Sequence, residues 1–310
     1  MIVTQTPLRI SLLGGNTDFP KYFKKYGGAV LTTTIDKYVY VIVKERFDDM
    51  IYINYSVKEK VNKVDDIKHD LVREAMKLVG VDKGIEITFL SDIPSEGSGL
   101  GSSSAVTVGV LNALHNYKGG SVAARQLVEE ACQIEIDILK KPIGYQDQYA
   151  IGFGGLNFFE FGKNVLRFSL STETNNYFML FYTGITRKSE KILKNTQFKK
   201  KILDLNKELA YKGVDALNNP LHFGSLLDEY WQLKKQLNKS VTNDFIERTY
   251  YKALLAGALG GKIVGAGGGG FLLLVVPPEK KEAVRKALGL RELPFNLSKD
   301  GSKVIFNIQK

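Results

Sequence analysis

The first 55 residues alternate between apolar and polar positions in the way that is typical of β-strands. β-Branched and aromatic residues dominate four runs, and pairs such as Gly14–Gly15, Gly27–Gly28 and Asp48–Asp49 separate them. Alternation with a period of two places one face of each run against a core. The pattern predicts that a sheet opens the protein, with strands at residues 2–11, 30–34, 38–44 and 51–55.

The middle of the chain combines helical periodicity with a glycine-rich loop. Apolar residues recur every three or four positions, and the longest such stretch begins at Ser121, a residue suited to a helix N-cap, and ends before Pro142. A loop at residues 94–104 leads directly into another apolar helical stretch. The predicted elements are helices at residues 67–79, 105–117 and 121–140, with a strand at residues 85–90 before the loop.

The last part of the chain contains more helix and no internal repeat. Strands and helices follow one another without regular alternation, which is typical of the α+β class. The polar residues 171–176 separate two parts of ordinary domain size, so we expect domains at residues 1–173 and 174–310. The predicted strands are residues 155–161, 177–182, 271–276 and 303–308, and the predicted helices are residues 187–193, 207–217, 223–237, 244–259 and 279–288.

Composition narrows the class of protein. With 44% hydrophobic and 25% charged residues, the chain resembles a globular protein and not a disordered one. The single cysteine, Cys132, cannot form an intrachain disulfide, and the first residues lack the charged and apolar regions of a signal peptide. The longest apolar run, residues 271–278, is far shorter than the roughly 20 residues of a membrane span. We therefore expect a cytoplasmic protein without a membrane partner.

The net charge of +10 permits a polyanionic partner or a phosphorylated substrate. Pairs of lysines are scattered among acidic residues, as on solvated helix faces, and the densest run is Lys199 to Lys201. Because no arginine-rich patch with interleaved aromatic residues is present, a nucleic-acid partner is not expected. The sequence gives no indication of the oligomeric state.

The loop from Pro94 to Ala105 is the most informative segment. Its glycines let the backbone approach a ligand, and its serines stand where a helix begins, so free N–H groups and the helix dipole would converge on an anion. A flexible linker is the alternative, but linkers seldom lead straight into an apolar helix. The lysine of the pattern G-x-x-x-x-G-K-S/T is missing, which excludes an ordinary P-loop.

A second glycine cluster, Gly265-Ala-Gly-Gly-Gly-Gly270, has the spacing G-x-G-x-x-G of dinucleotide-binding proteins. That fingerprint must end a strand and open a helix, whereas residues 271–276 here read as a buried strand. The cluster therefore indicates a tight turn that faces a substrate. A plain hairpin turn is the alternative.

Two carboxylates differ in their surroundings. Glu135 interrupts the apolar stripe of the helix that begins at Ser121, and a carboxylate on a buried stripe needs a cation. That cation could be a lysine, an arginine or Mg²⁺. Asp147 stands between Gln146 and Gln148, which could hydrogen-bond it, although helix N-capping would also explain an aspartate there.

Three segments, residues 7–18, 94–105 and 265–271, resemble in order and spacing the signature motifs of the GHMP kinases (galactokinase, homoserine kinase, mevalonate kinase and phosphomevalonate kinase). Within that family, the patterns around residues 7–20, 27–38 and 144–149 are most similar to D-glycero-D-manno-heptose 7-phosphate kinases and related sugar 1-kinases. The resemblance implies two α+β domains, the first with a left-handed βαβ unit and the second ferredoxin-like. It also implies that ATP and the acceptor meet between them.

The resemblance further implies roles for individual residues. Asp147 would be the catalytic aspartate with Arg9 beside it, and Mg²⁺ would be held by Ser103 and Glu135. Asp18 would hold sugar hydroxyls next to Gly15 and Asn16. The turn of Gly267, Gly268 and Gly269 would support the acceptor pocket. The ATP phosphates would lie against Pro94, Gly97, Ser98, Gly99, Leu100, Gly101, Ser102, Ser103 and Ser104.

The acceptor is the least defined part of this interpretation. The galactokinase pattern has Glu-His where this chain has Gly15–Asn16, which disfavours galactose. A sugar phosphate needs donors of its own, and Arg187, between a predicted strand and a predicted helix, offers one. An ordinary strand-to-helix turn would look the same. We expect an ATP- and Mg²⁺-dependent kinase of the anomeric hydroxyl of heptose 7-phosphate, with a fucose-type 1-kinase or a catalytically silent sensor as alternatives.

Overall fold

The computed structural model describes residues 1–94, 97–187 and 189–308, and its larger sheet follows the order β11-β1-β2-β5-β3-β4. Strand β6 joins this sheet beside β2, and β7 pairs with β6. The strands are β1 (Ile2–Leu13), β2 (Gly28–Glu45), β3 (Ile51–Asn54), β4 (Lys58–Val61), β5 (Ile85–Ser91), β6 (Leu156–Phe161), β7 (Val165–Leu170) and β11 (Lys303–Asn307).

Strand β2 is the centre of this sheet. The sequence predicted two strands here, but residues 28–45 form one continuous strand that pairs with β1 along nearly its whole length. Its first half also pairs with β6 and its second half with β5. The register shifts between Pro7 and Leu8, so a local irregularity of the β1–β2 ladder falls where the sequence indicated a gap between strands.

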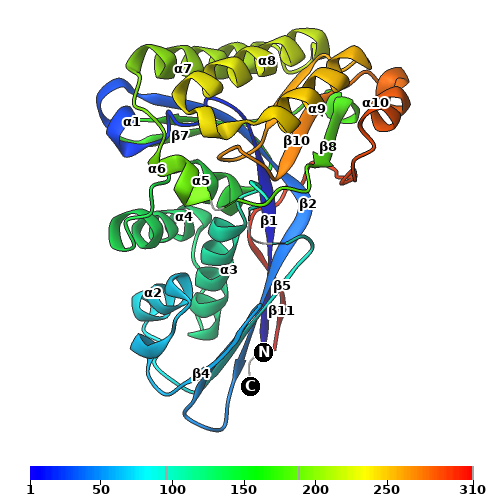
Figure 1. Ribbon diagram of the computed structural model, residues 1–310. Helices are drawn as coiled ribbons and strands as arrows, with labels where there is room; N and C mark the ends of the chain where they lie inside the picture. The colour runs from blue at the N-terminus through cyan, green and yellow to red at the C-terminus, as the bar shows by residue number, and fades with distance from the viewer. Residues whose placement is uncertain (95–96, 188, 309–310) are drawn as a thin grey trace.

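Helices cover one face of the large sheet (Figure 1). The central helix, α3, packs directly on β1 and β2, and most of its residues are buried, which explains its nearly continuous apolar sequence. The helices of residues 70–79, 124–132 and 146–153 pack against it. The helical elements of this part of the chain are α1 (Pro20–Tyr26), the 3₁₀ turn η1 (Val64–Asp66), α2 (Asp70–Val79), α3 (Ser102–Tyr117), α4 (Ala124–Cys132), the π-helical η2 (Gln133–Ile138) and α5 (Gln146–Phe153).

The second layer is a three-stranded antiparallel sheet with β10 in its middle. Helix α8 packs on β9 and also reaches β1, so it joins the two sheets. The strands are β8 (Phe178–Tyr182), β9 (Gly260–Ile263) and β10 (Phe271–Val275); the helices are α6 (Ser189–Lys194), α7 (Lys200–Asp215), α8 (Pro220–Leu237), α9 (Asp244–Leu255) and α10 (Lys281–Leu288), with 3₁₀ turns η3 (Thr174–Tyr177), η4 (Lys239–Val241) and η5 (Pro278–Lys280).

The α+β class is confirmed, and the structure differs from the prediction in several elements. The helix expected at residues 121–140 begins at Ala124 and turns into a π-helix after Cys132. Strands β4 and β7 and helices α1 and α5 were not predicted. A bridge between Phe181 and Glu292 stands where a fourth strand would complete a ferredoxin-like sheet.

The last strand returns to the first sheet. Residues 303–307 pair with β1, and the Met1 ammonium donates to the Ile308 carbonyl at 2.6 Å, so both ends of the described chain lie side by side (Figure 1). The second part of the chain therefore contributes a strand to the first layer, and the domain boundary at residue 173 stays a prediction. Among the described residues, no helix is long and apolar enough to cross a membrane.

Candidate active site

A cleft of about 740 Å³ lies where the two layers meet. Its walls come from β1 and the loop that follows it, the glycine loop with the start of α3, η2, the start of α5, and the second layer at α8 and the β9–β10 turn. The sequence-predicted residues that line it are Arg9, Gly15, Asn16, Asp18, Gly97, Ser98, Gly99, Gly101, Ser102, Ser103, Ser104, Glu135, Asp147 and Arg187.

The glycine loop takes a conformation that favours glycine. Gly97, Gly99 and Gly101 all have φ between +70° and +81°, where a side chain would be strained. Gly101 is the N-cap residue of α3 and brings no side chain to accept from the first turn. The backbone N–H groups of that turn, which have no partner within the helix, therefore remain available to an anion.

Two of the predicted phosphate contacts in this loop, Pro94 and Leu100, do not line the cleft. The Pro94 side chain is exposed, and the Leu100 side chain is fully buried in the core. The Leu100 carbonyl accepts from the backbone N–H of Arg9 at 2.9 Å. Leu100 therefore anchors the loop to β1. Its own N–H lies 3.4 Å from the Ser98 hydroxyl, to which it donates.

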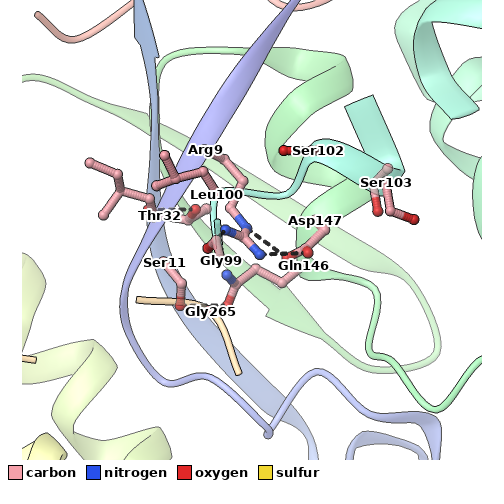
Figure 2. A network of polar contacts seen from close by, with 12 residues as sticks. Arg9, Ser11, Thr32, Gly99, Leu100, Ser102, Ser103, Gln146, Asp147 and Gly265 are labelled. Atoms are coloured by element: carbon pink, nitrogen blue, oxygen red, sulfur yellow. Dashed lines mark hydrogen bonds and ion pairs between the residues drawn. The ribbon is translucent and has the colours of Figure 1, made fainter. Parts of the chain in front are cut away.

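Arg9 and Asp147 form a bidentate ion pair at the centre of the site, as Figure 2 shows. The Arg9 Nε and Nη2 atoms donate to the two Asp147 oxygens at 2.7 and 2.6 Å, and Nη1 donates to the Gly99 carbonyl at 2.7 Å. Arg9 is buried, whereas the Asp147 side chain is 28% exposed toward the cleft. A carboxylate that is fixed by an arginine and still accessible can contact a ligand.

Asp18 lies near this pair and is held at the N-terminus of α5. Its Oδ2 atom accepts from the Gln146 N–H at 3.0 Å, and its carbonyl accepts from the Tyr145 N–H at 3.1 Å. Gly144 allows this approach, because a Cβ there would lie 2.0 Å from Asp18 Oδ2. Burial, with a smaller contribution from the charge of Asp147, raises the pKa of Asp18 to about 6.

Glu135 is fully buried on the π-helix beside the start of α3. The hydroxyls of Ser103 and Ser104 donate to its Oε2 atom at 3.3 and 3.2 Å, and its Oε1 atom has no hydrogen-bond partner among the described residues. Burial raises the pKa of Glu135 to about 7. An unpartnered carboxylate oxygen beside two hydroxyls fits Mg²⁺, which prefers oxygen ligands.

The third glycine motif contributes to the cleft differently from the prediction. Its first two residues line the cleft, but Gly267, Gly268 and Gly269 pack against the protein interior. The Gly268 N–H donates to the Val241 carbonyl at 2.6 Å, and a Cβ on Gly269 would lie 2.6 Å from the Ile185 carbonyl. These three glycines thus allow close packing behind the wall of the cleft.

Other polar residues of the site were not found from the sequence. The Ser11 hydroxyl donates to Gln146 Oε1 at 3.2 Å. Lys234 is buried, and its Nζ atom donates to the Gly265 and Ile263 carbonyls at 2.5 and 3.3 Å. A signal did exist for Lys234, because it interrupts a buried stripe of α8 formed with Tyr230, Leu233 and Leu237, just as Glu135 interrupts its own helix.

Comparisons with known proteins identify the family of this chain. Residues 67–155 match the GHMP kinases N terminal domain, and residues 210–292 match the GHMP kinases C terminal domain. The chain is 35% identical to a D-glycero-alpha-D-manno-heptose 7-phosphate kinase of Campylobacter jejuni subsp. jejuni, over 97% of this chain and 98% of that protein. The chain belongs to the GHMP kinase family.

Solved structures support the same assignment for this GHMP kinase. The crystal structure of a D-glycero-D-manno-heptose 1-phosphate kinase from Bacteriodes thetaiotaomicron is 27% identical, with a TM-score of 0.83 and full coverage of both chains. A putative sugar kinase from Campylobacter jejuni is 33% identical, with a TM-score of 0.79 over 98% of this chain and 97% of that chain. The predicted family and the ATP-dependent phosphotransferase activity are thereby confirmed, whereas the roles of individual residues stay predictions.

Proposed function

We propose that this GHMP kinase transfers the γ-phosphoryl group of ATP to the anomeric hydroxyl of D-glycero-D-manno-heptose 7-phosphate and forms the 1,7-bisphosphate. The observation that carries the proposal is the Arg9–Asp147 pair, which faces the same cleft as the glycine loop. The full-length similarity to the heptose 7-phosphate kinase supports this acceptor. A cytoplasmic location, where ATP is available, is part of the same proposal.

The chemistry needs a proton acceptor next to the attacking hydroxyl. In the proposed reaction the acceptor oxygen forms a bond to the γ-phosphorus, the bond from that phosphorus to the β,γ-bridging oxygen breaks, and ADP leaves. Asp147 accepts the proton of the hydroxyl, while Arg9 fixes the direction of the carboxylate and balances its charge. The hydrogen bond from Arg9 Nη1 to the Gly99 carbonyl connects this pair to the glycine loop.

The remaining lining residues suggest how ATP is held. The free N–H groups at the start of α3 are suited to the phosphates, and Ser103 with Glu135 would hold Mg²⁺. When bound, the ion would neutralise charge on the phosphate oxygens. Beyond Ser103 the cleft is lined by Tyr55, His69 and Leu71, an aromatic and apolar end that suits a nucleoside base.

Arg187 is the proposed contact for the phosphate that the acceptor already carries. Its side chain is exposed at the edge of the cleft, and its backbone lies against Gly97, where a Cβ would be 2.7 Å from the Arg187 nitrogen. Its Cδ atom would lie 3.2 Å from a Cβ on Gly268. Contact with both glycine motifs fixes the start of this side chain at the wall of the cleft.

The Arg187→Ala variant tests this contact. We expect the KM for the phosphorylated acceptor to rise by roughly 10- to 100-fold, since a charge-assisted hydrogen bond is worth about 1.5 to 3 kcal/mol, with little change in the KM for ATP. Arg125→Ala, which removes an exposed arginine of α4, serves as the control. An Arg187→Ala variant that distinguishes phosphorylated from free sugar as well as the parent does would contradict this assignment.

A substrate panel tests the function itself. The purified protein is incubated with ATP, Mg²⁺ and, separately, heptose 7-phosphate, heptose 1-phosphate, free heptose, mannose and fucose, while ADP release is followed. We expect the highest kcat/KM with heptose 7-phosphate and a new anomeric phosphate in the product by phosphorus NMR. Preference for free fucose would indicate a fucose-type 1-kinase, and binding without turnover of any member would indicate a silent sensor.

A further inference from the structure

Tyr230 is a buried tyrosine of α8 that lines the cleft beside Gly15 and Asp18, where the acceptor is proposed to bind. Its side chain is only 2% exposed. A Cβ on Gly15 would lie 2.6 Å from the Tyr230 hydroxyl oxygen, so the missing side chain of Gly15 makes room for this group. In the part of the chain that the structure describes, the hydroxyl has no hydrogen-bond partner.

The ring of Tyr230 lies against a buried lysine. The Lys262 Nζ atom lies 4.2 Å from the ring centroid and donates to the Leu12 carbonyl at 2.7 Å. Lys262 is 1% exposed, and burial lowers its pKa well below the usual value, so it holds the ring by close contact and by its bond to Leu12. Leu12 is the last residue but one of β1, next to the loop that carries Gly15, so one lysine contacts both the ring and the end of the strand that leads into this loop.

The hydroxyl is thus held in place and makes no hydrogen bond to the described residues. Because Tyr230 lines the cleft, this hydroxyl can bond to a ligand there. Burial raises the pKa of Tyr230, with a smaller contribution from the negative charge of Asp18. The hydroxyl therefore keeps its proton and acts as a donor, and Asp18 is near enough for its charge to act on it.

We infer that Tyr230 is a specificity-determining residue that donates a hydrogen bond to a hydroxyl of the acceptor other than the one that is phosphorylated. Asp18 complements it, because Oδ2 already accepts from the Gln146 N–H, while Oδ1 accepts no hydrogen bond from the described residues and can accept one from the sugar. A donor and an acceptor side by side suit a polyhydroxylated ligand. The inference rests on the proposed function only in that the acceptor is a sugar.

The Tyr230→Phe variant removes the hydroxyl and keeps the ring under Lys262. For the sugar that the parent phosphorylates best, we expect the KM of the acceptor to rise by about 10- to 100-fold and the KM of ATP to stay within about twofold. Tyr22→Phe is the matched control: its hydroxyl donates to Asp204 at 2.6 Å, and Tyr22 is not among the residues that line the cleft. This control should leave the acceptor KM unchanged.

Monodeoxy analogues of the acceptor separate binding from a merely structural role. The parent should discriminate against the analogue that lacks the hydroxyl bound by Tyr230, and Tyr230→Phe should lose that discrimination while keeping it at the other positions. A structural role would weaken all analogues equally and would lower the thermal midpoint. Gly15→Ala adds a geometric check. Its methyl group would collide with the Tyr230 hydroxyl oxygen and should impair acceptor binding. Tyr230→Phe in the same chain removes that oxygen and should restore part of the lost binding.

The panel on the parent protein tests the proposed function, and the comparison of parent with Tyr230→Phe tests this inference on whichever sugar is used. If the parent turns over no sugar, equilibrium binding of the same panel replaces the rates. An unchanged acceptor KM or affinity in Tyr230→Phe, an unchanged pattern of discrimination, or an effect confined to ATP would overturn the assignment. Weakened acceptor binding with loss of discrimination at one position would support it.

Discussion

Lys234 offers a test of how the structure holds a buried charge. Its side chain is 4% exposed, and its Nζ atom bonds only to the Gly265 and Ile263 carbonyls, with no carboxylate in an ion pair among the described residues. Burial, with a smaller contribution from the charge of Arg9, lowers the pKa of Lys234 from 10.5 to about 7. The lysine is therefore harder to protonate in the folded than in the unfolded chain.

The lowered pKa of Lys234 makes the free energy of unfolding depend on pH. Between pH 7 and 10.5 the unfolded chain binds a proton at Lys234 that the folded chain mostly does not, so the free energy of unfolding rises with pH. At about 1.4 kcal/mol for each pKa unit, the whole difference is on the order of 5 kcal/mol. Lys234→Met keeps the length of the side chain and removes this dependence. The stability of the parent relative to the variant should then rise by about 3 kcal/mol from pH 7.5 to 9.5.

Urea unfolding of both proteins at pH 7.5, 8.5 and 9.5 measures this difference, and the subtraction cancels groups whose titration does not depend on Lys234. Lys235→Met is the matched control. Lys235 is the next residue of α8, is about one-fifth exposed and pairs with Glu247 at 3.0 Å, so its variant should differ from the parent by a nearly constant amount. A constant difference between the parent and Lys234→Met over the same pH range would refute the reasoning.

Three further predictions concern the cleft. Asp147→Asn should leave ATP binding near normal and lower kcat by at least about 100-fold, and turnover within a few-fold of the parent would remove its proposed role. Glu135→Ala and Ser103→Ala should each raise the Mg²⁺ concentration for half-maximal rate, whereas an unchanged Mg²⁺ dependence would leave Glu135 with a structural role only. Because burial raises the pKa of Asp18 to about 6, acceptor kcat/KM should rise as the pH increases through about 6, and Asp18→Asn should reduce that inflection to the part that comes from ionisation of the acceptor phosphate.

Local patterns in the sequence predicted a substantial part of the site. The strained glycines and the helix that follows them are visible in one segment, and the interruption of an apolar stripe singled out Glu135. These signals work because the helical period and the φ preference of glycine are properties of a few neighbouring residues. The π-helix that carries Glu135 was missed, since its extra residue per turn leaves no separate mark in an apolar pattern.

Contacts between distant segments were beyond such patterns. The partner of Asp147 lies 138 positions away on β1, and only the resemblance to known kinases paired the two residues in advance. The sequence alone left N-capping as an explanation for Asp147, because a helix of eight residues between glycines gave too weak a periodic signal to be recognised. The pairing of β11 with β1 was not predicted either, because the sequence of a strand does not indicate which other strand it pairs with.

The two glycine motifs contact each other in the structure, which the sequence did not predict. The sequence assigned the glycines of the loop and of the turn separately to ligands, but the structure packs the two motifs on each other. A Cβ on Gly265 would lie 2.6 Å from the Gly99 carbonyl, and one on Gly270 would lie 2.8 Å from the Gly97 carbonyl. Several of these glycines are therefore required by the approach of two backbones, whatever ligand binds. Since Gly99 also accepts from Arg9 and Gly265 from Lys234, the packed motifs join the proposed catalytic pair to the second layer of the protein.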